Sequence, residues 1–130
     1  MVTILRTLTA LSGLGLLVFG LSWWVHPGAA ADMLGATLLD GTGRTTQIGD
    51  SGAFFVGAGS MLLWGALRKV PMLLIAGGGL VGLVIPGRVL SASIHGGSQT
   101  PDEIIAECVM LFLAVATAAA VNRTTHTTFG

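Results

Sequence analysis

Four long apolar segments, separated by short polar stretches, dominate the hydrophobic pattern of the chain. They cover residues 5–24, 51–67, 71–90 and 104–121, and the second extends back toward Thr46. Each is close to the ~20 residues that an α-helix needs to cross ~30 Å of hydrocarbon. Continuous apolar runs without alternation favour helices, which satisfy their own backbone hydrogen bonds in lipid. The pattern therefore predicts an all-α, four-helix transmembrane bundle over residues 1–130, with spans at about 5–26, 46–67, 71–95 and 101–121.

The composition supports this prediction, because 52% of the residues are hydrophobic and only 9% are charged, against roughly 25% charged in soluble domains. A different interpretation of the first segment is a signal peptide, since Arg6 precedes it and Gly28-Ala29-Ala30-Ala31 resembles a cleavage site. The apolar run is longer than a usual signal core, which favours a span. Cys108 is the single cysteine, so an intrachain disulfide is excluded, and we expect it to be a small core residue.

The charges divide between the two ends of the four predicted spans. Four basic residues fall on one side: Arg6, Arg68, Lys69 and Arg123. The positive-inside rule makes that side cytoplasmic and places both termini there. All six carboxylates fall on or near the other side, with Arg44, Arg88, His26 and His95. The net charge is zero and no basic run is present, so a nucleic-acid partner is not expected.

The loops and glycines indicate how the spans are arranged. The long outer loop, residues 26–49, is expected to hold a short interfacial helix over the bundle mouth, and Trp23 and Trp24 are expected to anchor at the headgroups. A tight turn at 68–70 makes the second and third spans antiparallel neighbours. Glycines should allow close packing of the helices: Gly13, Gly15, Gly20, Gly52, Gly57, Gly59, Gly78 and Gly82.

The segment from Ile85 to Glu107 carries more charge than a connecting loop needs. Thr100-Pro101-Asp102-Glu103 predicts a capping box, in which Glu103 reaches back to the amide of the cap residue. Glu107 lies about 9 Å along this helix from Pro101, near the top of the hydrocarbon. A carboxylate at that depth needs a partner or a proton.

Arg88 is the expected partner of Glu107, because it lies near the outer end of the preceding span, two residues after Pro86, which should bend that helix. Ser91 and His95 would share its face, and Asp50 could join from the second span. Each has a plainer explanation. Arg88 could snorkel to the headgroups, Asp50 could cap its helix, and His95 could belong to a solvated loop.

The chain resembles a family of small four-helix bacterial membrane proteins of unknown function that is distantly similar to the DoxX-like proteins. The resemblance rests on three motifs: Asp50-Ser-Gly-Ala-Phe-Phe-Val-Gly-Ala-Gly59, Gly87-Arg88-Val-Leu-Ser91 with His95-Gly96-Gly97, and Trp23-Trp24-Val-His-Pro27. It covers nearly the whole chain and implies a bacterial inner-membrane location and a polar centre at Asp50 and Arg88. His95 stands where similar sequences often have an aspartate. DoxX-like proteins have been linked to quinone-associated redox chemistry and to membrane complexes with soluble enzymes.

These features favour a binding or accessory function. An outer polar pocket would hold an apolar or lipid-like ligand, or a membrane partner or second copy, with the ligand-binding residues Arg88, Glu107, Asp50, His95, Glu103 and Trp24. The alternative is a cofactor-independent isomerase or hydrolase acting on a quinone-, isoprenoid-, epoxide- or sterol-like substrate. Glu107 or Asp50 would then be a general acid or base, and Arg88 or His95 would stabilise negative charge.

No motif for a metal or cofactor is visible in the sequence, although His26 or His95 leaves haem open. We therefore expect neither a metal nor a cofactor. A transporter of four helices would need to oligomerise, and it is the third hypothesis.

Overall fold

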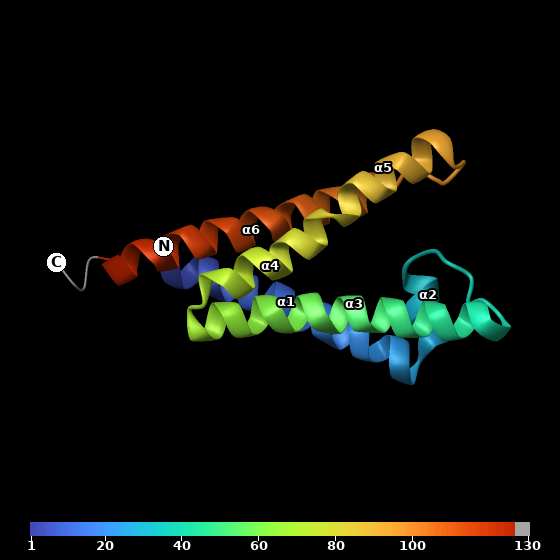
Figure 1. Cartoon of the computed structure of the whole chain (residues 1–130), viewed down its shortest axis with the longest axis horizontal. Coiled ribbons are helices and arrows are strands. Elements are labelled where there is room, and N and C mark those ends of the chain that lie inside the picture. Colours follow the sequence, from blue (N-terminus) through green and yellow to red (C-terminus); the bar gives the residue numbers. More distant parts are fainter. Residues whose placement is uncertain (127–130) are drawn as a thin grey trace.

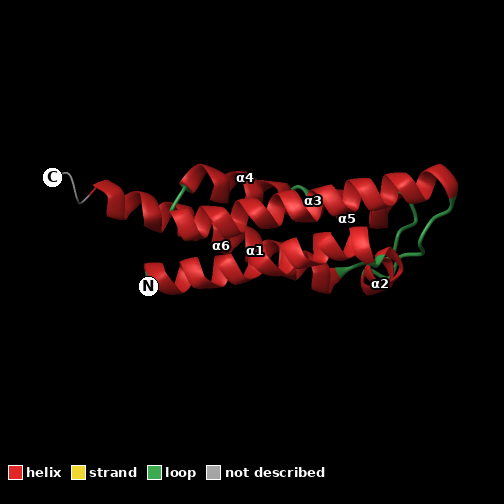
Figure 2. Ribbon diagram, turned by 90° about the horizontal axis from the view of Figure 1, so that it is seen from below, coloured by secondary structure: helices red, strands yellow, loops and turns green. Residues whose placement is uncertain are grey.

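The computed structural model describes residues 1–126, and side chains over residues 1–123. Within this part every regular element is an α-helix (Figure 2), as predicted. The helices are α1 (Val2–Val25), α2 (Pro27–Met33), α3 (Gly41–Arg68), α4 (Pro71–Gly82), α5 (Val84–Ile94) and α6 (Pro101–His126). Three described stretches are long and apolar enough to cross a membrane: Val2–Val25, Pro71–Ile94 and Pro101–Arg123. The second expected span, α3, is not among them, and its first turns are rich in polar residues.

Glycines bring α1 and α3 into very close contact along their length. Gly13 and Gly20 on α1 face α3, while Gly52 and Gly59 on α3 face α1. A Cβ atom on Gly13 would lie 2.5 Å from the backbone nitrogen of Leu63, so no larger residue fits there without moving a helix. In both helices the two glycines recur after seven residues, and the two backbones therefore approach at two successive levels. Gly15 and Gly57 face open space instead.

The remaining long helices, α4 and α6, pack against α3 and α1. Lys69 adopts a left-handed conformation (φ 57°) at the end of α3 and turns the chain into α4. The α4 glycines Gly78 and Gly82 then face Ala114 and Leu111 of α6, which confirms the expected close packing. Thr9 joins α1 to α6 through a buried 2.8 Å hydrogen bond with Thr117. Small residues thus allow these helices to approach closely around the buried side chains of Leu62, Leu74 and Val81.

The bundle opens toward the end that holds α2 and α5, where α5 and the first turns of α6 diverge from α1 and α3 (Figure 1). The divergence follows a break between α4 and α5 at Leu83. Pro86 lies in the first turn of α5, and its ring would clash with the carbonyl of Gly82 in a continuous helix. The interruption of regular helical hydrogen bonding that Pro86 was expected to cause is therefore present.

The segment between α1 and α3 folds back over the end of α1. Its short helix is present as α2, which begins at Pro27, and Leu38-Leu39 lie in the non-helical segment that follows. Ala30 and Ala31 pack on Trp23, which is only 1% exposed. The expectation that Trp23 anchors at the headgroups is wrong, because α2 covers it, whereas Trp24 remains half exposed.

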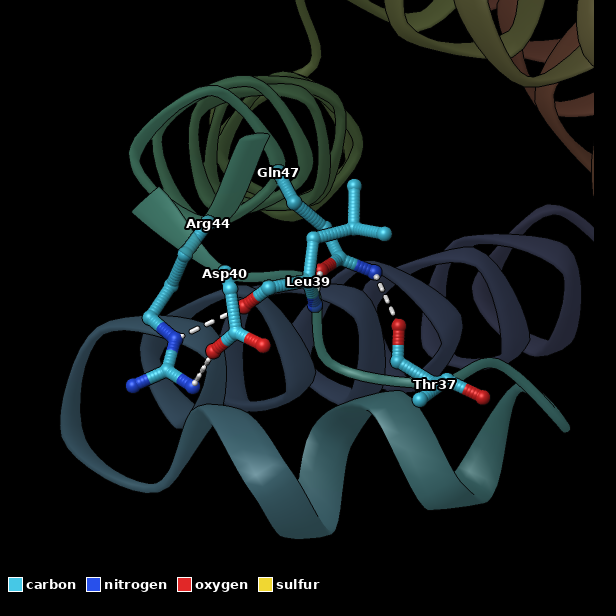
Figure 3. Close-up of polar contacts among 5 residues, drawn as sticks. All are labelled: Thr37, Leu39, Asp40, Arg44 and Gln47. Atoms are coloured by element: carbon cyan, nitrogen blue, oxygen red, sulfur yellow. Dashed lines mark hydrogen bonds and ion pairs between the residues drawn. The ribbon is translucent and has the colours of Figure 1, made fainter. Parts of the chain in front are cut away.

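Side chains of α3 hold the non-helical segment in place (Figure 3). The Gln47 side chain accepts from the amide of Leu39 at 2.9 Å and donates to the carbonyl of Thr37 at 3.3 Å. Arg44 donates to the Leu39 carbonyl and pairs with Asp40, both at 2.8 Å. Arg44 and Gln47 lie in the first turns of α3. The helix begins at Gly41, several residues before the predicted start of the second span.

Four of the six Lys and Arg residues lie at the opposite end of the bundle: Arg6, Arg68, Lys69 and Arg123. Arg6 donates to the carbonyls of Ala66 and Leu67 at 2.8 and 3.1 Å, which places it beside Arg68 and Lys69. The N-terminus and the end of α6 also lie at this end (Figures 1 and 2). Hereafter we refer to it as the basic end, and to the end with α2 and α5 as the acidic end.

Candidate functional site

An ion pair between α5 and α6 forms the centre of the site. Arg88 Nε donates to Glu107 Oε1 at 2.7 Å, so the pair expected from the sequence is present. Glu107 is buried, with 7% of the residue exposed, whereas the Arg88 side chain is 25% exposed. The two helices are antiparallel, and both residues lie equally far from the connecting loop, so the hairpin brings them to one level.

Thr100, at the start of α6, adds a longer contact to Arg88. Its hydroxyl accepts from Arg88 Nη1 at 3.4 Å, while its carbonyl accepts from the amide of Ile104 at 3.1 Å. Helix α6 therefore begins after Thr100, with Pro101 at its first position, as predicted. The capping box is wrong: in the described residues, Glu103 makes no hydrogen bond back to Thr100. The hydroxyl expected to cap the helix faces Arg88 instead.

The polar groups of this pair are only partly satisfied. Glu107 Oε2 is buried and has no hydrogen-bond partner among the described residues. Arg88 donates through Nε and Nη1, and within residues 1–123 no acceptor contacts its Nη2. Buried polar atoms in proteins are nearly always paired. Glu107 Oε2 is the buried atom of the pair that lacks a partner, whereas Arg88 Nη2 is accessible and keeps its donors for a further group.

A cleft of about 520 Å³ lies between α5 and the part of α3 nearer the acidic end. It is lined by Leu34, Asp50, Ser51, Phe54, Phe55, Val84, Gly87, Arg88 and Ser91. Asp50 and Arg88 come from opposite walls, and Ser91 shares the face of Arg88, as the helical spacing predicted. Phe54 and Phe55 give the α3 wall an aromatic surface, with ring centroids 5.0 Å apart. This space is hereafter the α3–α5 cleft.

A second, smaller cleft of about 290 Å³ lies between α5 and the start of α6. Its lining includes Arg88, Ala92, Thr100, Pro101 and Ile104. Arg88 thus borders both clefts, whereas Glu107 lines neither. The geometry makes Glu107 a residue that positions Arg88 rather than one that meets a molecule in either cleft.

The structure brings together some of the predicted site residues and leaves others apart. Asp50 lies well inside α3, with Asp40 at the position before the helix, so the explanation of Asp50 as a cap is wrong. His95 is exposed at the end of α5, and Glu103 is half buried in the first turn of α6; neither lines the α3–α5 cleft. Trp24 packs its ring on Gly52, also outside the cleft.

Sequence reasoning missed several residues that shape the site. The two phenylalanines were visible only as part of the motif that follows Asp50, and their role as a cleft wall depends on the distant α5. Thr100 was assigned to capping. Cys108 was expected in the core but is exposed on α6, one residue after the buried Glu107.

The chemistry available in the α3–α5 cleft is that of charge and apolar contact. Among the described residues, no cluster of three or more His, Cys, Asp or Glu side chains could hold a metal ion. His26 is exposed between α1 and α2, away from the cleft. The cleft offers a carboxylate, a guanidinium and a hydroxyl beside aromatic and aliphatic walls, an arrangement that suits an amphiphilic molecule.

Comparison of the chain with protein-family models, with curated proteins and with solved structures found no match.

Proposed function

We propose that this protein is a four-helix, multi-pass protein of the bacterial inner membrane that binds an apolar or lipid-like ligand in the α3–α5 cleft. The observation that carries the proposal is the cleft itself, with apolar walls and two charged residues, Asp50 and Arg88, on opposite sides. The protein would act as an accessory subunit of a membrane partner. That partner would contact either the bound ligand or the protein surface next to it. The resemblance to the DoxX-like proteins is part of this proposal.

The packing of α3 supports its role as the fourth span. At 1.5 Å per residue, the helix Gly41–Arg68 extends over about 42 Å, and it packs along α1, which is apolar enough to cross the membrane. Its polar first turns would lie beyond the hydrocarbon, beside the outer loop that they hold. The basic end would face the cytoplasm, with both termini, by the positive-inside rule.

The partly satisfied ion pair supports ligand binding over a purely structural role. A buried pair contributes little to stability after its desolvation. Here the pair fixes a guanidinium at the border of a cleft and leaves its Nη2 donors free of described partners. Such a group can meet a ligand acceptor without first being reoriented.

An enzyme that acts by acid–base chemistry is the second candidate. The observation that favours it is that Asp50 and Arg88 line the same cleft without pairing with each other among the described residues. Asp50 would transfer a proton and Arg88 would stabilise the resulting negative charge. Glu107 does not line the cleft, so it would position Arg88 rather than react.

Native mass spectrometry of the gently extracted protein tests the proposal. We expect one apolar or amphiphilic molecule per chain, which is retained less well when Gly87→Trp places an indole ring in the cleft, where a Cβ at Gly87 meets no other atom. Gly79→Trp is the matched control, because a Cβ at Gly79 also meets no other atom and Gly79 lies on α4 outside the cleft. A protein without a bound small molecule, or one bound only to other chains, would contradict ligand binding. Conversion of the identified molecule by wild-type protein, but not by Asp50→Asn, would favour the enzyme.

A further inference from the structure

Building on the proposed function, we infer that the α3–α5 cleft binds one zwitterionic phospholipid. The ammonium of its headgroup would lie at Asp50, its phosphate at Arg88, and part of an acyl chain along Phe54, Phe55 and Val84. All five residues line this one cleft, with the charged residues on opposing walls. Its volume of about 520 Å³ lies within the roughly 300–1,000 Å³ of ligand sites.

The depth of the two charges supports a lipid as the occupant. Asp50 lies about 27 Å along α3 from Arg68, and Arg88 lies about 26 Å from Pro71 along α4 and α5, at 1.5 Å per residue. The hydrocarbon core of a bilayer is ~30 Å thick. If the basic end lies at one face of the bilayer, both side chains reach the level where the opposite headgroups begin.

The balance of charge selects the headgroup. Glu107 already compensates Arg88, which retains donors on Nη2 for a hydrogen-bond acceptor. The described residues provide no ion-pair partner for Asp50, so its carboxylate can take a cation. A phosphoethanolamine headgroup supplies both, because its phosphate accepts from the guanidinium and its ammonium donates to the carboxylate. A phosphoglycerol headgroup would satisfy Arg88 but would place an uncompensated negative charge near Asp50.

The openness of the site fits a molecule that enters from the bilayer. Helix α5 contacts α6 and α4 but diverges from α3 at the acidic end (Figure 1). The rings of Phe54 and Phe55 therefore face a gap that no described helix fills. An acyl chain could fill it, and the headgroup would remain at the surface between the two charged side chains.

The test is a competition among lipids that differ only in the headgroup. The delipidated full-length protein is given equal amounts of phosphatidylethanolamine and phosphatidylglycerol with identical acyl chains, and native mass spectrometry counts the lipids retained. We expect one phosphatidylethanolamine per chain, preferred about fivefold, as an ion pair near the surface allows. Asp50→Asn should abolish the preference, and Asp50→Lys should reverse it. Asp32→Asn is the control, since Asp32 is exposed on α2 outside the cleft.

The possible outcomes separate this inference from the proposed function. Equal retention of the two lipids by the wild-type protein, or a preference that survives Asp50→Lys, would overturn the zwitterionic headgroup while leaving an apolar ligand in place. A neutral apolar molecule that copurifies and blocks both lipids would do the same. Retention of no small molecule by any variant would overturn both.

Discussion

Removing the carboxylate of Glu107 should destabilise the bundle, and replacing its partner as well should restore much of the loss. Breaking a buried ion pair on one side costs about 3–5 kcal/mol, because the other charge stays buried. Here the Arg88 side chain is 25% exposed and can turn toward the headgroups. We therefore expect Glu107→Leu to lower the free energy of unfolding by about 2–3 kcal/mol. The double variant Arg88→Met/Glu107→Leu should lie within about 1 kcal/mol of the wild type, since apolar replacement of a buried pair is often neutral.

Reversible unfolding in mixed micelles, with an increasing fraction of sodium dodecyl sulfate, measures these differences. The buried Trp23 provides the fluorescence signal. Asp40→Asn is the control, because the Asp40–Arg44 pair is exposed and such pairs often contribute nothing measurable. Losses that simply add in the double variant would refute the reasoning, because they would show that Arg88 and Glu107 are not energetically coupled.

Two further predictions concern the packing of the helices, and the same unfolding assay measures both. Gly59→Leu should prevent a stable α1–α3 pair, because a Cβ at Gly59 would overlap the backbone of α1. Gly57→Leu should change stability little, because Gly57 faces open space. Similar effects of the two changes would contradict the close approach of the helices. Thr9→Ala should cost about 0.6–1.7 kcal/mol through its lost bond to Thr117, and adding Thr117→Ala should cost little more; full additivity would contradict that bond.

The helices were predictable because a long apolar segment in lipid can satisfy its backbone hydrogen bonds only in a few structures. An apolar run of sufficient length must satisfy its backbone internally in lipid, so residue type alone indicated long helices, three of which contain a stretch apolar enough to cross a membrane or continue into one. Pro71 and Pro101 also marked two helix starts, since proline is tolerated at the first helical position. The start of α3 was not visible in this way. Its first turns are polar, and their helical state depends partly on bonds that Arg44 and Gln47 make to the preceding loop.

The site was predictable only where a residue conflicted with its surroundings. Arg88 and Glu107 stood out because charges in apolar segments need partners, and the two are joined. His95 and Glu103 were included because they share a segment or a helical face with the pair, but periodicity says nothing about which neighbouring helix a face meets. The cleft arises from the divergence of α5 and α3, which are far apart in sequence, so no local pattern contained it. The burial of Trp23 likewise depends on α2 folding back over it.

The ion pair also has a consequence for how the protein is made. Arg88 and Glu107 belong to consecutive stretches that are each long and apolar enough to cross a membrane, joined by a short loop. A single charged side chain raises the free energy of inserting a helix into the bilayer, by up to about 2.5–3.5 kcal/mol at its centre. During biosynthesis the stretch that contains Arg88 emerges from the ribosome before the one that contains Glu107. We expect the two to leave the insertion machinery together, as a neutralised hairpin, rather than one after the other.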